Sequence, residues 1–355
     1  MRIGYSFWGF LGPGVVDTPD GGRSHRRVLI DGIRSRGHDI VFLQRDRDRA
    51  ETGLDLTGTY TWDDGFPDID ALFLEWRWPI PGRNTTPCAT TGHTCDLHRQ
   101  QALLDHYTHR VATPTVVWDK DQHVSGDDPL RRVSNVAVCE PALSPSPDAV
   151  SLLFPVADDA IAAADPAQLA SSPRPLTLAY VGNQYGRDDA FDGFFAPTAT
   201  AVDHVVAGKW TDTDRWPHVR FIGRIPFPEV QELYGTALAT ILLVPKRYAR
   251  TGQMTQRLPE AVLAGCVPLC PATIHHADTL VPPELLIRNG ADAVLRLQWL
   301  RDHAGRGEHA DLLAGCLRLL RRFALTTQLD TVERVLDHLT TPAATPVTTL
   351  AGGYA

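Results

Sequence analysis

Residues 255–269, which read TQRLPEAVLAGCVPL, decide the fold of this chain. Arg257 and Glu260 are three positions apart and therefore share one face of a predicted helix. They stand near its start, where free backbone N–H groups and a partial positive charge favour a diphosphate. Gly265 predicts the end of the helix, and Val267–Leu269 begins a buried strand. This order of features is typical of a nucleotide-sugar site.

The pattern R-x-x-E-A-x-x-A-G at residues 257–265 resembles the donor-binding element of glycosyltransferases with the GT-B fold. It is most similar to the branch related to spore-maturation glycosyltransferases. The resemblance implies an α/β protein with two Rossmann-like domains that face each other across a cleft. It also implies that Glu260 binds the ribose of a nucleoside diphosphate sugar, most commonly a UDP-sugar, and that no cofactor is needed.

Gly252 departs from the family pattern. Many retaining members carry a second Glu eight residues before the ribose Glu, and here that position is Gly252. Retaining chemistry is therefore not supported by the motif. For Arg257 and Glu260 alone, a surface ion pair would be the simpler interpretation, because such pairs are common on helices. The full fifteen-residue pattern favours the functional interpretation.

Composition narrows the class of protein. The length of 355 residues predicts two domains rather than one core. Apolar residues at 43% and charged residues at 21% are ordinary for a globular protein. The net charge of −8 argues against binding nucleic acid through bulk electrostatics, although a local basic cleft stays compatible with it.

Six scattered cysteines lack C-x-x-C spacing, so the sequence predicts neither a zinc site nor a disulfide framework. The chain enters an apolar strand directly, and no apolar run approaches the roughly 18 residues of a membrane span. We therefore expect a cytoplasmic protein with no membrane contact.

Two units of strand, glycine turn and helix divide the chain. Arg2–Trp8 is a predicted strand followed by a glycine-rich loop, which is how a doubly wound sheet begins. Leu176–Val181 begins the second unit after a linker rich in Ala, Pro and Ser. We expect an acceptor domain over residues 1–155 and a donor domain over residues 156–330. Residues 331–355 are predicted to form a terminal helix that crosses back to the first domain, followed by a disordered tail.

Glycine turns after the strands of the second domain are candidates for the donor site, because ligands of open α/β sheets bind at the carboxyl ends of the strands. Basic side chains there could neutralise a diphosphate, and backbone N–H groups could hold its oxygens. A solvated loop charge is the alternative for each basic residue alone. The predicted donor-binding residues are Glu260, Arg257, Lys209, Arg224, Gly182, Asn183, Gly252, Thr255 and Gln256.

The first domain is predicted to supply the catalytic base. An inverting transfer needs a carboxylate or imidazole to take the proton of the acceptor, which is a weak nucleophile. Glu75 ends a buried strand, where removal from water suits it to that role. Asp119 and Asp20 are its rivals. Each of the three could instead be a helix cap or an ion-pair partner.

The acceptor is predicted to lie between the glycine loop and the segment that follows the third strand. The predicted acceptor-binding residues are Gly12, Gly14, Gly21, Gly22, Trp76 and His123. Trp76 and Trp78 are two positions apart, so at most one of them lines a cleft and the other belongs to the core. The triplet Asp119-Lys120-Asp121 matches a D-x-D metal pattern. Because three other triplets of the chain match it too, we predict no metal site.

The sequence predicts a glycosyltransferase. It would move a sugar from a nucleoside diphosphate sugar to a small cytosolic acceptor with an aromatic or nucleoside-like part. An aromatic wall suits a flat ring. Three alternatives stay open. One is transfer to a modified base in DNA, flipped out of the duplex. The others are a nucleotide-sugar epimerase of the same fold and a non-catalytic module that binds a sugar nucleotide.

Overall fold

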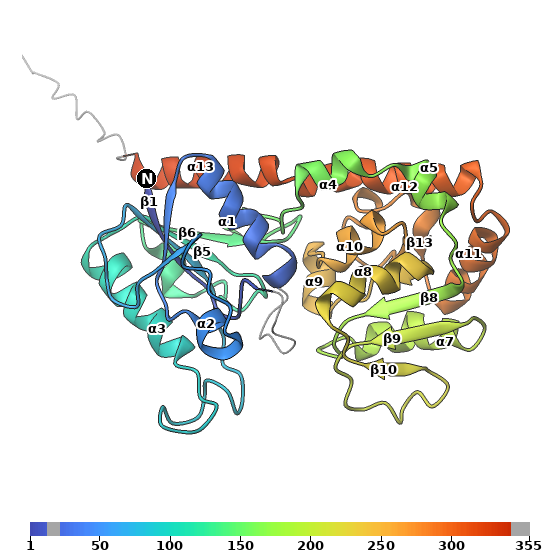
Figure 1. Ribbon diagram of the computed structural model, residues 1–355, viewed down its shortest axis with the longest axis horizontal. Helices are drawn as coiled ribbons and strands as arrows, with labels where there is room; N and C mark the ends of the chain where they lie inside the picture. Colours follow the sequence, from blue (N-terminus) through green and yellow to red (C-terminus); the bar gives the residue numbers. More distant parts are fainter. Residues whose placement is uncertain (13–21, 342–355) are drawn as a thin grey trace, which may run out of the picture.

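The computed structural model describes residues 1–12 and 22–341. Gly14, Asp20, Gly21 and the predicted disordered tail therefore lie outside the described residues. Figure 1 shows two α/β halves side by side, with helices of the C-terminal part running along one side of both. No helix in the described part of the chain is long and apolar enough to cross a membrane.

The first half is built on a seven-stranded parallel sheet with the order β3-β2-β1-β4-β5-β6-β7. Its strands are β1 (Arg2–Ser6), β2 (Asp39–Phe42), β3 (Thr61–Trp62), β4 (Ala71–Glu75), β5 (Thr115–Trp118), β6 (Val136–Glu140) and β7 (Val150–Ser151). The helical segments are η1 (Gly22–Ser24), α1 (Arg26–Ser35), α2 (Arg47–Thr52), α3 (Asp96–Leu103), η2 (Leu104–Arg110) and η3 (Pro129–Arg132). The central strands are buried on both faces, as parallel strands covered by helices must be.

The second half is built on a six-stranded parallel sheet with the order β10-β9-β8-β11-β12-β13. Its strands are β8 (Leu176–Val181), β9 (His204–Ala207), β10 (Phe221–Gly223), β11 (Ala237–Ile241), β12 (Val267–Pro271) and β13 (Leu286–Ile287). Its helical segments are α4 (Asp158–Ala163), α5 (Pro166–Ser171), α6 (Asp188–Ala190), η4 (Phe191–Phe195), α7 (Ala196–Ala199), α8 (Phe227–Thr236), α9 (Lys246–Thr251), α10 (Arg257–Leu263), η5 (Ala277–Thr279), η6 (Pro283–Leu285), α11 (Gly290–Asp302), α12 (Gly307–Leu320) and η7 (Arg321–Phe323). The predicted α/β class with two Rossmann-like sheets is confirmed.

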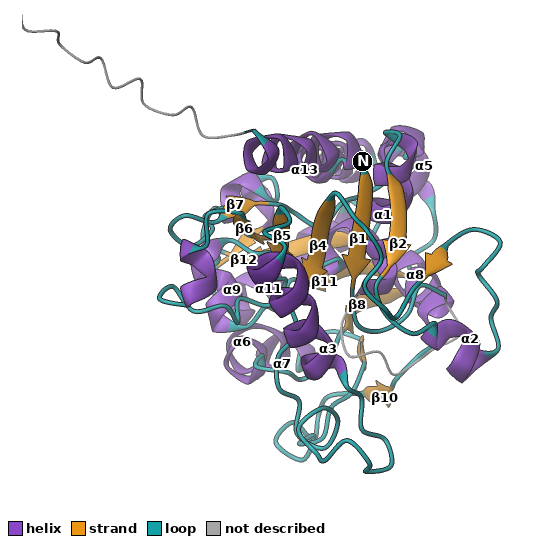
Figure 2. Cartoon of the chain, turned by 90° about the vertical axis from the view of Figure 1, so that its left-hand side faces the viewer, coloured by secondary structure: helices purple, strands orange, loops and turns teal. Residues whose placement is uncertain are grey.

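The last helix, α13 (Leu325–Thr340), packs against the first half. Its apolar side chains, among them Leu329 and Val332, belong to the same core cluster as β1 and α1. Arg36, the residue that follows α1, adds ion pairs to Asp330 and Glu333. Figure 2 shows α13 crossing above the first sheet near the N-terminus of the chain. Residues 325–340 therefore pack against the first strand and first helix of the chain.

The helix that carries Arg257 and Glu260 lies where the sequence predicts it. α10 begins at Arg257 and ends before Gly265, whose φ of 75° is the left-handed conformation that a helix end commonly needs. The polar composition of residues 246–256 predicts a loop, but α9 forms over Lys246–Thr251 because Pro245 suits a helix start and Tyr248 is buried. The inward-facing apolar residues of His98–Val111 predict a helix, and one is found there. It starts two residues earlier, at Asp96, and widens into a π-helical turn from Leu104.

Candidate functional site

Three turns meet at the carboxyl edge of the second sheet. They follow β8, β9 and β10, and they hydrogen-bond to one another. The Lys209 N–H donates to Asn183 Oδ1 at 2.9 Å, and the Gly208 N–H donates to the Gly223 carbonyl at 2.7 Å. Asn183, Lys209 and Arg224 are exposed at this edge, whereas Gly182 is buried. The structure thus gathers four of the predicted donor residues into one place.

Gly208 allows that close meeting of turns. Its φ is 136°, and a Cβ atom there would lie 2.1 Å from the Gly182 carbonyl oxygen. Any larger residue at 208 would push the two turns apart. The same carbonyl accepts a hydrogen bond of 2.7 Å from Trp210 Nε1. These contacts fix the backbone of the first turn.

Arg187 braces the same turn from inside and was missed by the sequence analysis. Its buried guanidinium donates to the carbonyls of Leu243, Asn183 and Tyr185 at 3.1, 3.1 and 2.9 Å. A buried arginine that satisfies main-chain carbonyls holds a loop in one shape. No sequence motif signals this role, because the three carbonyls come together only in the fold.

Arg257 and Glu260 stand beside these turns. Arg257 Nε donates to the Val181 carbonyl, at the end of β8, and Nη1 donates to Thr255 Oγ1 at 3.1 Å. Gln256 precedes the helix as its cap residue. Glu260, one turn along α10, is half-buried and accepts a hydrogen bond of 2.5 Å from Ser24 Oγ of η1, in the other half of the molecule. The predicted donor carboxylate therefore faces the first domain.

Gly252, which was predicted to bind the donor phosphates, is buried at the junction of the two halves. The His275 carbonyl and Leu143 are packed against its Cα. The next residue, Gln253, is fully buried and donates from Nε2 to the Lys120 carbonyl at 2.6 Å. This part of the chain forms the junction between the halves, so Gly252 is enclosed by protein rather than presented to a phosphate.

Glu75 is the centre of a buried charge cluster. Its carboxylate accepts hydrogen bonds from Tyr5 at 2.8 Å and from Lys120 at 2.5 Å. Arg26 donates to both carboxylate oxygens, at 2.8 and 2.6 Å. Glu75 and Arg26 are at most 1% exposed. Because the Glu75 carboxylate already accepts hydrogen bonds from two cations and a hydroxyl, its contacts are those of a structural residue. This arrangement weighs against the predicted role of Glu75 as the catalytic base.

Asp119 lies directly after β5 and is fully buried. Oδ2 accepts a hydrogen bond of 2.6 Å from the Val124 N–H. Oδ1 has no hydrogen-bond partner among the described residues. Burial raises the pKa of this carboxyl to about 6, against the opposing effect of backbone N–H groups of His123 and Val124. A carboxyl with a pKa near neutrality matches what general acid–base chemistry requires.

An aromatic group lies beside Asp119, and it contains Trp78 rather than Trp76. The Trp78 ring stacks on His123 with centroids 4.7 Å apart and meets Trp8 edge-on at 4.5 Å. Trp76 instead packs against the core on the other face of the sheet. Desolvation and the charge of Arg247 lower the pKa of His123 to about 4, so this exposed ring is neutral at pH 7. The two tryptophans therefore face opposite sides, as predicted, and Trp76, which was predicted to bind the acceptor, is the one that packs against the core.

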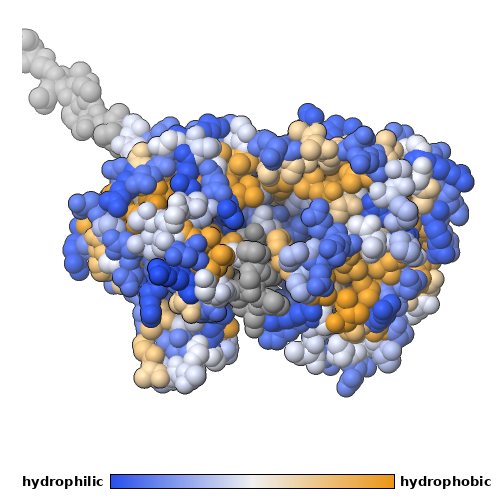
Figure 3. Space-filling model, viewed as in Figure 1, coloured by the Kyte–Doolittle hydropathy of each residue, from blue (hydrophilic) through white to orange (hydrophobic). Residues whose placement is uncertain are grey.

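The glycine loop of the first domain is anchored by Asp48, which the sequence analysis also missed. Asp48 accepts hydrogen bonds from the N–H groups of Leu11 and Gly12, at 3.0 and 2.8 Å. Gly22 stands over the Arg26 guanidinium, at the start of α1. The described ends of the loop thus lie next to the Glu75 cluster. The surface is indented between the two halves (Figure 3).

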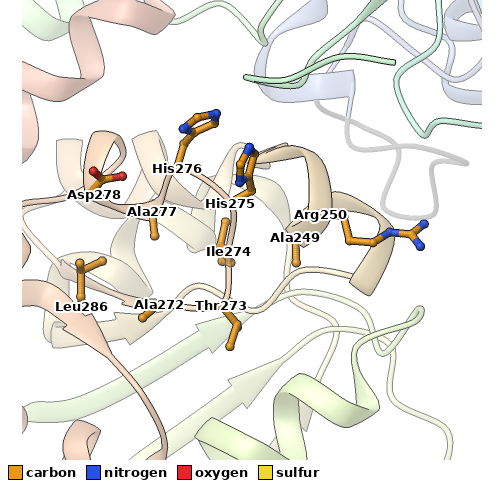
Figure 4. Close-up of a pocket in the computed structure, with 10 residues that line it drawn as sticks. All are labelled: Ala249, Arg250, Ala272, Thr273, Ile274, His275, His276, Ala277, Asp278 and Leu286. Atoms are coloured by element: carbon orange, nitrogen blue, oxygen red, sulfur yellow. The ribbon is translucent and has the colours of Figure 1, made fainter. Parts of the chain in front are cut away.

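A separate hollow of 490 Å³ opens on the second domain between α9 and the segment after β12. Figure 4 shows His275 and His276 of this hollow extending to the same side. His276 Nε2 is 2.9 Å from Ser144 Oγ of the first half. None of the predicted donor residues lines this hollow, so it is an additional feature of the junction.

Several solved structures that are similar to this chain are glycosyltransferases. No protein-family model matches the sequence, and a search of the curated proteins finds no match. The phage T4 β-glucosyltransferase, solved with UDP and Mn²⁺, is similar with a TM-score of 0.63 at 15% identity, over 95% of this chain and 100% of that one. An α-glucosyltransferase, solved with UDP-glucose and DNA containing an abasic site, is similar with a TM-score of 0.58 at 12% identity, over 95% and 99%.

A third similar structure is a glycosyltransferase from a biosynthetic pathway. AviGT4, a glycosyltransferase involved in avilamycin A biosynthesis, is similar with a TM-score of 0.54 at 14% identity, over 95% of this chain and 97% of that one. At these identities the likeness establishes the fold. The chain therefore has the GT-B fold, with two Rossmann-like domains on either side of a cleft, as the sequence predicts.

Proposed function

We propose that this protein is a glycosyltransferase that takes a sugar from a UDP-sugar held by the second domain and passes it to an acceptor held by the first. One observation carries the proposal. Glu260 and Arg257 stand at the start of α10 beside the turns of Gly182, Lys209 and Arg224, and Glu260 faces the other domain. Because a fold alone does not define a function, the proposal depends on this site.

In this proposal Glu260 binds the ribose hydroxyls through its carboxylate. Lys209, Arg224 and Arg257 lie near the diphosphate, with Asn183 and the N–H groups of the turns and of Thr255 and Gln256. Positive groups there would stabilise the negative charge that grows on the departing diphosphate. The reaction then needs no divalent metal. Transfer that disappears in Mg²⁺-free and Mn²⁺-free buffer and returns with either ion would contradict this part of the proposal.

For the base, we favour Asp119 over Glu75. Asp119 has a raised pKa and an oxygen without a described partner, whereas the Glu75 carboxylate is occupied by Arg26 and Lys120. Asp20 stays a candidate outside the described residues. His123, neutral and exposed beside Trp78, is proposed to touch the acceptor.

The acceptor is proposed to be a small molecule with an aromatic or heterocyclic part, which would stack on Trp78 and His123. A net charge of −8 favours a small acceptor over a long nucleic acid. Transfer to a modified base in DNA is the second candidate. It is favoured by the likeness to the phage T4 enzyme and to the α-glucosyltransferase solved with DNA.

One experiment separates the two acceptors. The protein is incubated with labelled UDP-sugars and, in parallel, with nucleoside-like or aromatic compounds and with duplex DNA carrying hydroxymethylated pyrimidines. Label in the small compounds supports the first candidate. Label only in DNA, with binding that weakens steeply as salt rises, would establish the second. Release of an epimerised UDP-sugar, with no transfer, would identify an epimerase.

A further inference from the structure

The segment between β4 and α3 brings four metal-binding side chains together. Cys88, His93, Cys95 and His98 each offer a ligand atom, and these atoms lie within 4.8 Å of one another. The segment hangs from the first domain on the side of α3 (Figure 1, Figure 2). No other group of three or more such side chains with this spacing occurs in the described part of the chain. The cysteine spacing alone predicted no zinc site, because the chain lacks C-x-x-C pairs and these four residues follow the unusual order C-x₄-H-x-C-x₂-H.

Main-chain turns place the four residues. The Thr90 N–H donates to the Pro87 carbonyl, and the His93 N–H donates to the Thr90 carbonyl, at 2.9 and 3.0 Å. Cys95 is the residue that precedes α3, and the Arg99 N–H donates to its carbonyl at 2.9 Å. Cys95 and His98 are thus one helical turn apart and share a face. Hydrogen-bonded turns and the start of α3 therefore position the four side chains.

The side chains are oriented as metal ligands are. Cys88 Sγ lies 3.2 Å from His98 Nδ1. His93 Nδ1 is 3.1 Å from Thr86 Oγ1, whereas His93 Nε2 is inaccessible to solvent and has no hydrogen-bond partner among the described residues. Metal-bound histidines commonly donate their second ring N–H to a neighbouring oxygen, as Nδ1 can to Thr86. An imidazole with one nitrogen so anchored and the other unpaired is prepared to bind a cation.

We propose that Cys88, His93, Cys95 and His98 bind a structural Zn²⁺ ion. Two thiolates and two imidazoles are a ligand set that Zn²⁺ prefers, and two thiolates balance its charge. Tetrahedral Zn²⁺ with ordinary bond lengths needs ligand atoms about 3.3–3.8 Å apart, which small rotations of these side chains achieve. Four protein ligands close the coordination shell and leave no position for a substrate. The ion therefore stabilises the segment and takes no part in glycosyl transfer.

Metal binding by these four residues would stabilise the start of α3 and, through it, the side of the cleft that contains Trp78. The start of α3 holds buried Arg77, since Gln100 Oε1 accepts from the Arg77 N–H at 2.8 Å and the Asp96 carbonyl accepts from Nη1 at 3.2 Å. Arg77 also donates to Ser6 Oγ and to the Phe7 carbonyl, each at 2.6 Å. Trp78 is the next residue. The proposed ion thus connects the hanging segment to the aromatic side of the cleft, and the inference does not depend on the nature of the donor.

Metal content measured on the intact protein tests the proposal. Protein purified under reducing conditions and dialysed against excess Zn²⁺ and then metal-free buffer is expected to keep about one zinc per chain by elemental mass spectrometry. Cys95→Ser and His98→Ala should lose it. His109→Ala, an exposed histidine on η2, is the matched control and should keep it. Co²⁺ in place of Zn²⁺ should give the visible absorption of a tetrahedral thiolate complex.

Limited proteolysis supplies a second readout. Removal of zinc from the wild type should speed cleavage within residues 79–95, and re-addition of Zn²⁺, but not Mg²⁺, should reverse this. Zinc retained equally by Cys95→Ser and His98→Ala would overturn the proposal. So would reduced wild-type protein that binds no Zn²⁺ or Co²⁺, including the case in which Cys88 and Cys95 are found joined as a disulfide before reduction.

Discussion

The hydroxyl of Ser24, in η1 of the first domain, donates a hydrogen bond of 2.5 Å to Oε1 of Glu260, on α10 of the second. The carboxylate proposed to bind the donor ribose therefore also makes a contact across the cleft. A ribose with two hydroxyls would have to share or replace this contact. The Glu260 carboxylate would therefore couple donor binding to the contact that Ser24 makes between the two domains.

Glu260→Ala is expected to weaken UDP binding by about 1.5–3 kcal/mol, the range for hydrogen bonds to a charged group. Isothermal titration calorimetry measures the change. Glu232→Ala, an exposed carboxylate on α8, is the control and should bind UDP as the wild type does. Ser24→Ala should bind UDP as tightly as the wild type or more tightly, because it removes a competitor. Equal UDP affinity of wild type and Glu260→Ala would refute the ribose assignment.

Glu75→Gln is expected to act on stability. Loss of the carboxylate leaves the Arg26 guanidinium and the Lys120 ammonium buried without their shared counter-charge, which typically costs about 3–5 kcal/mol. Urea unfolding followed by circular dichroism should show that loss in the free energy of unfolding. If the unfolding curve is unchanged while transfer stops, Glu75 is the base after all.

Asp119→Asn tests the proposed base through its pH dependence. Folding raises the pKa of this carboxyl from 3.8 to about 6, so the native state binds more protons than the unfolded state between those values. The contribution of Asp119 to stability is therefore present at low pH and is lost as pH rises through about 6. At pH 7 the variant should match or exceed the stability of the wild type.

The same variant should lose transfer activity. As a general base, Asp119 must be ionised, so wild-type turnover should rise with pH and level off above about 6. Asp119→Asn should reduce kcat by roughly 10²–10⁴-fold and abolish this rise. A variant with wild-type turnover would move the role to Asp20, for which Asp20→Asn is the next test.

Trp78→Ala and Trp76→Ala form a matched pair, two residues apart on opposite faces. Trp78 lies with His123 at the cleft, so its loss should raise the KM for the acceptor while slow hydrolysis of the donor stays unchanged. Trp76 packs against the core, so its loss should lower the free energy of unfolding instead. Steady-state kinetics and urea unfolding measure the two effects. The reverse pattern would place the acceptor against Trp76.

The sequence predicts the second domain's motif well because that information is local. Arg257, Glu260 and Gly265 lie within nine residues, and helix spacing alone determines how they are arranged. The strands are likewise predictable from short apolar runs, and β8 matches its predicted bounds, Leu176–Val181.

The first domain's site is less predictable because its contacts are distant in sequence. Glu75 meets Arg26 and Lys120, 49 and 45 residues away, and no spacing rule joins them. The four proposed zinc ligands are close in sequence, yet their order is unlike that of familiar zinc motifs, so only the fold of the loop reveals them. The spacing of Trp76 and Trp78 predicts that they face opposite sides, but only the packing of the fold shows that Trp76 is the one against the core.

The most direct test of the proposed glycosyltransferase activity is release of UDP from a panel of UDP-sugars, without acceptor, by wild type and Glu260→Ala at equal concentration. Many transferases hydrolyse their donor slowly, so we expect the wild type to release UDP from at least one UDP-sugar. We expect Glu260→Ala to release much less UDP at donor concentrations below KM. Tight UDP-sugar binding by the wild type with no release from any donor would contradict the account and indicate a non-catalytic binding module.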